Sequence, residues 1–306
     1  MTAVTALAAV GEVAAVTAAR AVKAPMGELR LDIGVRNGRS LATGQYHRGA
    51  LRVIRPHYLD DSGQVCYVTV NPGGAYLGGD LYTMDITVAE HARLLLTTQS
   101  ATKIYKTPNS YAEQRLAVKL AANSSLEYMP GQLIAYRGAA YRQSALIEMD
   151  ASASLIMAEV LTPGWSPDGT PFRYEQLRLR NEIRYGGELL AIDNVLLTPT
   201  SAGTAAVVGR PVADIAGLAF MEGFSHLGSL LVVDARIDAA LVAELQQLLL
   251  KYEPDTLTGI SLLNGPGFVV RALAGSTTVL TSMMDELTGL LRERWFGQAP
   301  LNLRKY

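Results

Sequence analysis

The chain is poor in the side chains that most often carry out chemistry in proteins: it has one cysteine, Cys66, and four histidines among 306 residues. A single thiol cannot close an internal disulfide, so we expect a cytoplasmic protein. The histidines are scattered, and no two are spaced to share one face of an element. The His-Glu-x-x-His, Cys-x-x-Cys and Gly-x-Ser-x-Gly motifs are absent. The sequence therefore predicts neither a catalytic motif nor a resident metal site.

Charge of one sign and long apolar runs are also scarce. The 27 basic and 28 acidic residues give a net charge of −1, which argues against nucleic acid binding because that function needs a basic surface. No apolar run is long enough to cross a bilayer, so we expect no membrane partner. The Ala/Val-rich start carries Glu12 and lacks a basic leading segment, which disfavours a signal peptide. Hydrophobic residues nevertheless make up 49% of the chain, and this predicts an apolar surface patch for a protein partner.

Alternation of apolar and polar residues dominates the chain from Glu28 to about Thr200. The pairs Asn37-Gly38 and Gly186-Gly187 are typical of tight turns between two such runs. Because no helical pattern separates the runs, we expect antiparallel layers. The predicted strands lie at residues 29–36, 65–70, 81–88, 145–149, 177–180, 182–185 and 188–192.

The pattern changes after Pro211. A short apolar strand at 230–234 is followed by a helical pattern at 238–252, a hairpin formed by 256–263 and 268–273, and a second helical pattern at 279–296. We therefore predict a mainly β fold: a layered or helical arrangement of many short antiparallel strands with a small C-terminal α+β subdomain carrying two helices. The expected division is an N-terminal extension (1–26) whose order the sequence leaves open, a β-rich body (27–210) and the α+β subdomain (211–306). The best candidate boundary between the last two lies at 198–206.

Two groups of residues suggest a site, and both have a structural alternative. The glycine-rich turn at 70–80 ends on Asp80, where a Walker loop would need Lys followed by Ser or Thr, so nucleotide binding is disfavoured. Asp80 either caps its own turn or faces a ligand that the glycines admit. Further carboxylates lie on or beside apolar strands, and they either face solvent or line a common interior where they would hold a divalent ion weakly. These are Glu127, Glu148, Asp150, Glu159, Glu175 and Glu182.

Four motifs in order resemble those of the UreD (UreH-type) family of urease accessory proteins. They are Arg48–Pro56 (RGALRVIRP), Leu77–Asp80 (LGGD), Thr97–Tyr105 (TTQSATKIY) and Leu126–Pro130 (LEYMP). Asn71-Pro72 stands where that family commonly has two prolines, and Tyr128 stands in the place of a tryptophan. The similarity runs from about Gly27 to the C-terminus. None of the motifs is catalytic, but as an ordered set they are specific.

The resemblance implies a β-rich protein without enzymatic activity that binds apo-urease. It further implies a complex with UreF and the GTPase UreG, through which nickel reaches the urease active site along an acid-lined passage. By motif, Asp80 is the first residue that the resemblance assigns to this passage; Glu159 and Glu182 follow by a looser alignment. Nickel would be transient cargo with no stably bound cofactor, and oxygen donors suit such a role because thiolates would retain the ion.

Two other classes of function are open on the residues alone. A carboxylate-dependent hydrolase would need a second carboxylate about 5–10 Å from Asp80 in an open cleft. A β-sandwich binding module for a carbohydrate or peptide would need a row of exposed aromatic side chains. Only two tryptophans, Trp165 and Trp295, are present, and Trp295 lies on the predicted core face of a helix.

Overall fold

The computed structural model describes residues 24–199, 215, 217, 220–301 and 303. One set of strands is β1 (Gly27–Arg36), β2 (Arg39–Gly49), β5 (Leu81–Val88), β8 (Ala112–Leu120), β11 (Ala140–Met149), β13 (Gln176–Tyr185) and β14 (Glu188–Leu197). The other set is β3 (Arg52–Val53), β4 (Val65–Val70), β6 (Arg93–Thr98), β7 (Thr102–Ile104), β9 (Ser125–Met129), β10 (Leu133–Ala135), β12 (Ser154–Leu161), β15 (His226–Val233), β16 (Thr256–Leu262) and β17 (Gly267–Ala274).

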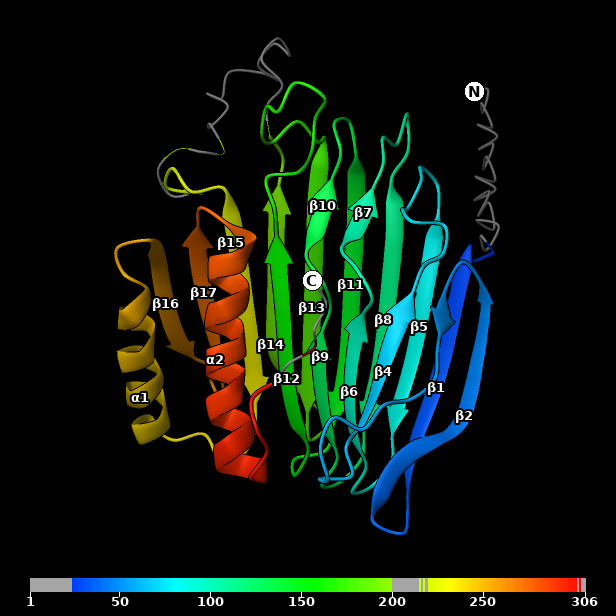
Figure 1. Ribbon diagram of the computed structural model, residues 1–306, viewed down its shortest axis with the longest axis vertical. Coiled ribbons are helices and arrows are strands. Elements are labelled where there is room, and N and C mark those ends of the chain that lie inside the picture. The colour runs from blue at the N-terminus through cyan, green and yellow to red at the C-terminus, as the bar shows by residue number, and fades with distance from the viewer. Residues whose placement is uncertain (1–23, 200–214, 216, 218–219, 302, 304–306) are drawn as a thin grey trace, which may run out of the picture.

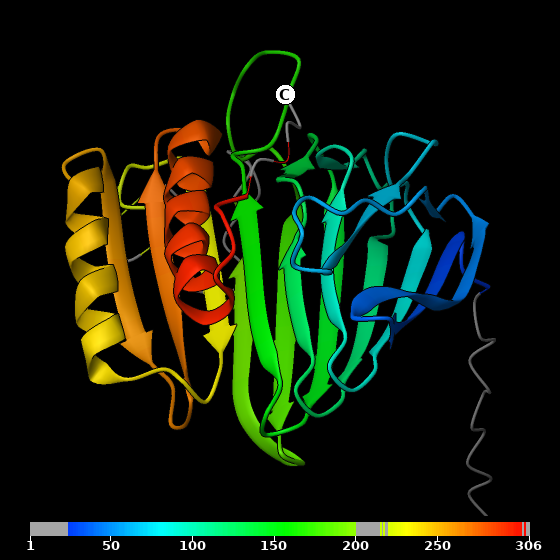
Figure 2. The same cartoon turned by 60° about the horizontal axis from the view of Figure 1, so that its bottom comes forward.

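The two sets form two sheets that face each other (Figures 1 and 2). The seven-stranded sheet has the order β14-β13-β11-β8-β5-β1-β2. The ten-stranded sheet has the order β16-β17-β15-β12-β9-β6-β4-β3, with the short strands β7 and β10 beside this path. Strands that follow one another in the sequence thus often lie in different sheets.

Residues 65–185 form a coil whose successive strands alternate between the two sheets. Each turn of the coil runs along one strand of the ten-stranded sheet, passes through a short connector and returns along a strand of the seven-stranded sheet. The four turns pair β4 with β5, β6 with β8, β9 with β11, and β12 with β13. Neighbouring turns are parallel and pair without a register shift in both sheets.

The mainly β class and the two C-terminal helices are confirmed, but antiparallel pairing is wrong for the coil. Antiparallel pairs occur towards the edges, as in β1 with β2, β13 with β14, and β15 with β17. The lack of helices between strands pointed to antiparallel layers, because a parallel pair needs a long crossover connection. Here the strand in the opposite sheet is itself that crossover, so period-two alternation and parallel pairing coexist.

Two apolar layers hold the fold together. One lies between the sheets, and the other lies between the outer face of the ten-stranded sheet and the helices α1 (Ala239–Leu249) and α2 (Thr277–Phe296). Both helices lie on the same side of that sheet (Figures 1 and 2). Because β6 is covered on both faces, Leu94, Leu95 and Leu96 are all buried, and each contributes about 1.5–3 kcal/mol by leaving water.

Local signals in the sequence explain where several elements begin and end. The turn between β1 and β2 holds Asn37 and Gly38 at φ values of 51° and 74°, as a two-residue hairpin turn requires. The carboxylate of Asp238 accepts the Leu241 N–H (2.8 Å) and begins α1, which continues as the short 3-10 helix η1 (Leu250–Tyr252). Gly297, in the left-handed region at φ 60°, ends α2. Both helices lie where the apolar spacing predicted them.

The ten-stranded sheet continues from the coil into the C-terminal unit, because β12 pairs with β15. The predicted boundary at 198–206 falls largely outside the described residues, as do residues 1–23 of the predicted extension. The division into domains therefore stays a prediction. Neither helix in the described ranges is long and apolar enough to span a bilayer.

Candidate functional site

Glu159 lies on β12 and points into the space between the two sheets. Its strand alternates faces: Met157 and Leu161 pack between the sheets, whereas Ile156 and Ala158 pack beneath the helices. The parity of the strand therefore turns Glu159 inward. Of the two alternatives that the sequence left open for this carboxylate, the interior one is correct.

Two amides from the seven-stranded sheet hold the Glu159 carboxylate. Nε2 of Gln143 donates to Oε1, and Nδ2 of Asn181 donates to Oε2 at 2.9 Å. Burial raises the pKa of Glu159, and the hydrogen bonds from Asn181 and Gln143 offset only part of that rise. Asn181 is itself buried, and its Oδ1 accepts no hydrogen bond within the described part of the chain. An acceptor oxygen without a donor thus lies beside a carboxylate that forms no direct ion pair within the described residues, although the charge of Arg271 acts on it.

An ion pair lies at the more exposed end of the same region. In the ten-stranded sheet Ser229 is the register partner of both Glu159 and Arg271, and in the seven-stranded sheet Asn181 is opposite Asp193. Nη2 of Arg271 donates to Oδ1 of Asp193 and so joins the two sheets. We call Gln143, Glu159, Asn181, Asp193 and Arg271 the inter-sheet polar cluster. Arg271 is 35% exposed, so the cluster extends from the interior towards solvent.

A cavity of about 40 Å³ adjoins the buried end of this cluster. Glu159 and Gln143 line it together with Tyr76, Gln114 and Tyr128, and the Tyr76 hydroxyl donates to Oε1 of Gln114 at 2.7 Å. The volume is enough for roughly two or three water molecules. The wall thus presents a carboxylate, amides and hydroxyls.

A second cavity of about 40 Å³ lies next to the first and shares part of its wall. Its polar lining consists of five hydroxyl side chains together with Asn71 and Lys103, and it reaches the exposed residues Gly74 and Ser100 at the ends of the strands. The residues that line both cavities are Leu51, Thr69, Tyr76, Thr98 and Thr102. Together the two cavities mark a line of polar groups from Glu159 to the glycine-rich turn.

Asp80 is nearly buried and belongs to the glycine-rich turn itself. Its Oδ2 accepts the Leu77 N–H at 2.8 Å and the Tyr82 hydroxyl at 3.1 Å. The ring of Tyr82 stacks on Tyr76, with 3.7 Å between the ring centroids, and Tyr76 lines both cavities. Asp80 therefore caps its own turn and adjoins the cavities only through two tyrosines.

Glu182 lies on the opposite face of the seven-stranded sheet from its neighbour Asn181. It forms ion pairs with Arg184 at 2.9 Å and Arg180 at 3.0 Å. The hydrogen bond from Arg184, with smaller contributions from both arginine charges, lowers the pKa of Glu182. The structure thus places Glu159 in the space between the sheets and leaves Glu182 on the outer face. Asp80 is connected to that space only through Tyr82 and Tyr76.

An isolated charge between apolar residues of a strand is expected to face solvent, and Glu127 is the clearest exception. Its side chain is 2% exposed and lies beneath α2, where Nη1 of Arg292 contacts both carboxylate oxygens at 2.6 Å. Every residue of its strand is buried, because β9 is covered on both faces. Two features of the sequence could have indicated this position. They are the five residues of β9, which have no solvent-facing alternation, and Arg292, which follows the leucines of α2.

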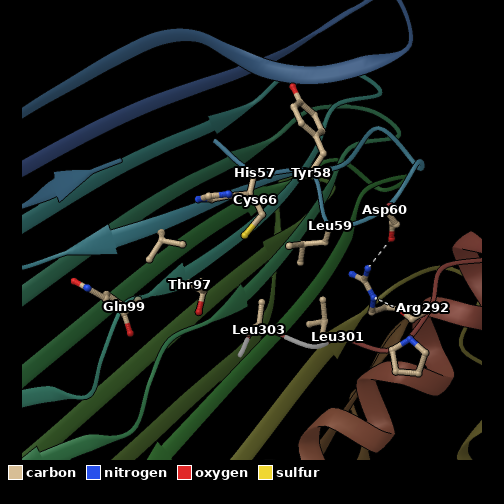
Figure 3. Close-up of a pocket in the computed structure, with 14 residues that line it drawn as sticks. His57, Tyr58, Leu59, Asp60, Cys66, Thr97, Gln99, Arg292, Leu301 and Leu303 are labelled. Carbon is tan, nitrogen blue, oxygen red and sulfur yellow. Dashed lines mark hydrogen bonds and ion pairs between the residues drawn. The ribbon is translucent and has the colours of Figure 1, made fainter. Parts of the chain in front are cut away.

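A groove of about 720 Å³ lies outside the inter-sheet space, between β4, β6 and the segment that follows α2. Figure 3 shows Arg292 reaching from α2 towards Asp60 at one end of it. Asp60 is the one carboxylate among the described residues that line this groove. Burial raises its pKa, but hydrogen bonds from Ser62 and Gln298 and the charge of Arg292 outweigh that effect and lower it. This groove therefore lacks the carboxylate pair, one member with a raised pKa, that a hydrolase would need.

The amides that sequence reasoning missed occupy apolar positions of alternating strands. Gln114 and Gln143 are register partners on β8 and β11, and Asn181 follows the inward-facing Leu179 on β13. These amides could have been identified from the sequence as polar residues at strand positions where the alternation predicts an inward-facing apolar residue. In the described ranges no three His, Cys, Asp or Glu side chains gather as metal ligands. The arrangement offers one carboxylate and neutral oxygens, which suit weak and exchangeable binding of a divalent cation.

Known proteins related to this chain are consistent with the resemblance seen in its motifs. The family model described as UreD urease accessory protein matches residues 26–305. A urease accessory protein UreD from Arthrobacter sp. (strain FB24) is 57% identical over 92% of this chain and 94% of its own length. The protein of that name from Paenarthrobacter aurescens is 55% identical over 92% of this chain and 95% of its own. One from Bacillus cereus is 33% identical over 93% of this chain and 100% of its own. The chain therefore belongs to the UreD family of urease accessory proteins.

Proposed function

We propose that this chain is a cytoplasmic, non-enzymatic scaffold in urease maturation. In this proposal it binds apo-urease and, with UreF and the GTPase UreG, conducts nickel to the urease active site. Membership of the UreD family supports the urease assignment. The observation that carries nickel conduction is Glu159, a half-buried carboxylate between the sheets whose hydrogen-bond donors are two neutral amides, at the wall of a polar cavity.

The chemistry of this wall suits a passing cation. The Glu159 carboxylate is one hard oxygen ligand, and the free Oδ1 of Asn181 beside it is a second. The hydroxyls of the second cavity can replace waters of a hydrated ion along the way to the surface. Nickel is held by oxygen alone along this line, so each contact is weak enough to release it.

Asp80 and Glu182 have different places in the proposal. Asp80 is a secondary acidic station behind Tyr82, near the mouth of the second cavity. Glu182 lies outside the interior line and is held by two arginines. Its place in the nickel route rests on the sequence alignment alone.

The test is Glu159→Gln in cells that produce urease together with UreF, UreG and this chain. Glutamine keeps the size of the side chain and removes its charge. We expect urease activity and the nickel content of purified urease to fall about tenfold at limiting nickel. The amount of urease recovered with the tagged chain should not change. Full activation by Glu159→Gln would overturn the nickel route while leaving the scaffold role standing.

The matched control is Glu113→Gln. Glu113 precedes the inward-facing Gln114 on β8 but forms an ion pair with Arg115 on the outer face, so this change should leave activation intact. Asp80→Ala should lower activation less than Glu159→Gln does and leave complex assembly unchanged. Equal losses for Glu113→Gln and Glu159→Gln would show that general charge, rather than the interior carboxylate, governs activation.

A further inference from the structure

The connectors between the two sheets form a third, narrow side of the coil. Their backbones are joined in sequence: Tyr105 N–H donates to Tyr76 O at 3.0 Å, Tyr136 N–H to Ile104 O at 2.9 Å, and Trp165 N–H to Ala135 O at 2.9 Å. The strands β7 and β10 and the isolated bridges on either side of them belong to this side. One connector from each of four turns is therefore aligned with the next.

This alignment places one large side chain from each turn in a row on the surface. The residues that face inward, such as Tyr76, Ile104 and Ala135, are buried, and the next position in each connector faces out. We call the three aromatic members of the outward row, Tyr105, Tyr136 and Trp165, the aromatic ladder; Leu77 continues the same row. Leu77, Tyr105 and Trp165 are 52%, 41% and 50% exposed. The number of tryptophans alone does not predict this row, because tyrosines complete it.

The rings of the aromatic ladder contact one another. The centroids of Tyr105 and Tyr136 are 4.8 Å apart with an interplanar angle of 70°, and those of Tyr136 and Trp165 are 4.9 Å apart at 39°. The spacing matches that of neighbouring strands, so the backbone alignment sets it. Rings tilted in this way give no flat platform of the kind on which sugar rings stack. Exposed Tyr and Trp side chains in contact are instead characteristic of protein interfaces.

Unpaired cations lie beside the aromatic ladder. A groove of about 680 Å³ contains Tyr105, Tyr136 and Trp165 in its wall together with Lys106, Arg137 and Arg173. None of these three cations forms an ion pair within the described residues, and the one carboxylate in this wall is the exposed Glu175. A chain with a net charge of −1 thus concentrates positive charge at this face. The groove complements carboxylates.

The groove also contains a buried polar group that lacks a partner. Tyr174 is 2% exposed, lies in the groove wall, and its hydroxyl makes no hydrogen bond within the described ranges. The segment that follows the groove residue Pro199, residues 200–214, contains one basic residue, Arg210, and one acidic residue, Asp214, so its own charge is balanced. Within the described residues the groove wall holds three cations and one carboxylate, so an acidic segment of another molecule would complement it.

We propose that the aromatic ladder and its cationic groove form the docking surface for an extended acidic segment of a partner protein. Apolar side chains of the segment pack on the rings, and its carboxylates pair with Lys106, Arg137 and Arg173. The inference does not depend on nickel conduction, because the surface is on the outside of the coil.

The test is a calorimetric titration of the full chain with a short synthetic peptide in which glutamate alternates with proline and leucine. We expect a Kd of about 0.1 mM or tighter at low salt. Raising NaCl from about 0.05 to 0.5 M should weaken binding severalfold, because exposed charge pairs are screened. A peptide with lysine in place of glutamate should not bind. Trp165 fluorescence should shift on binding, and the Trp295→Phe variant, which removes the other tryptophan, should show the same shift.

Two variants locate the surface. Trp165→Ala should weaken peptide binding about tenfold, and the double variant Arg137→Glu with Arg173→Glu should abolish it. The matched controls are Leu189→Ala and Arg178→Glu, exposed positions on the seven-stranded sheet that should bind like the wild type. Unchanged circular dichroism and urea midpoints would show that each variant is folded.

Three outcomes would overturn the proposal. One is equal affinity for the acidic and the basic peptide, and another is no binding of the acidic peptide at about 1 mM. The third is binding of an acidic polysaccharide such as polygalacturonate without binding of the peptide, which would make the ladder a carbohydrate site.

Discussion

Glu127 and Glu159 are two carboxylates on the same sheet, the first buried and the second half-buried, and their surroundings are opposite. Their strands, β9 and β12, are neighbours, with Glu127 opposite Ile156 in the register. Glu127 points beneath the helices and contacts Arg292 through both oxygens, whereas Glu159 points between the sheets and is held by amides. Glu127 forms a direct ion pair inside the chain, whereas Glu159 forms none within the described residues and feels the charge of Arg271 only at longer range. One face of the ten-stranded sheet thus binds α2 through Glu127, and the other face presents the carboxylate oxygens of Glu159 to the space between the sheets.

The Glu127 pair is part of a larger network that attaches α2 and the following segment to the sheet. Gln64 donates from its Nε2 to Oε1 of Glu127 at 2.8 Å, and Arg292 donates from its Nε to the Ala299 carbonyl at 3.1 Å. Nε2 of Gln298 donates to Oδ2 of Asp60 at 3.1 Å. Such a buried network stabilises a fold only while each member keeps its partner.

The largest effect in this comparison should come from removing the cation. Arg292→Met leaves Glu127 buried and unpaired, which costs about 3–5 kcal/mol of unfolding free energy. Urea denaturation of the full chain, followed by circular dichroism, measures this loss. The double variant Arg292→Met with Glu127→Leu should recover most of it, because it removes the stranded charge. A loss below about 1 kcal/mol for Arg292→Met would show that the pair is not a fastening element.

Glu159→Gln should raise the unfolding free energy at neutral pH, whereas Arg292→Met lowers it. The folded chain raises the pKa of Glu159 above the unfolded value of 4.5, so its contribution to stability is fully present below that value and is lost as pH rises through the folded pKa. The variant should therefore be more stable than the wild type at pH 7, by about 1 kcal/mol or less. The Asn181 amide can turn to let its free Oδ1 accept from the new amide.

The check is the urea midpoint of the wild type and of Glu159→Gln at a series of pH values. The gap between the two should be widest near neutrality and close towards about pH 4.5 and below, where both side chains are neutral. A variant that is less stable than the wild type at pH 7 would mean that the carboxylate is satisfied by its neighbours, and would remove the contrast with Glu127.

Local features of the fold could be predicted from the sequence, and long-range ones could not. The hairpin at Asn37-Gly38, both helices and their faces, and the turn capped by Asp80 follow from a few neighbouring residues. The pairing of strands does not, because a period of two fits parallel and antiparallel neighbours equally well. Sheet pairing was therefore the part of the fold class that the structure corrected.

The candidate site could be predicted only in part for the same reason. Glu159 entered through its resemblance to a family pattern, but its amide partners come from β11 and β13 and become neighbours only when the coil closes. Glu127 and Arg292 are 165 residues apart, so no local pattern links them. Glu182 lies between Asn181 and Ile183, and the phase of its strand, which it shares with Arg180 and Arg184, makes it face out.

Glu182→Gln should give the smallest effect, with a pH dependence opposite to that of Glu159→Gln. Hydrogen bonding to Arg184 lowers the pKa of Glu182, so its contribution to stability is present above the unfolded value of 4.5 and is lost as pH falls through the folded pKa. The wild type should be slightly more stable than this variant at pH 7, and the difference should shrink below about pH 4.5. Salt at about 0.5 M should reduce the difference, because this ion pair is on the surface. If Glu182→Gln instead stabilised the chain at pH 7, as Glu159→Gln should, the outward orientation of Glu182 would be wrong and the contrast between the two faces of the sheets would fail.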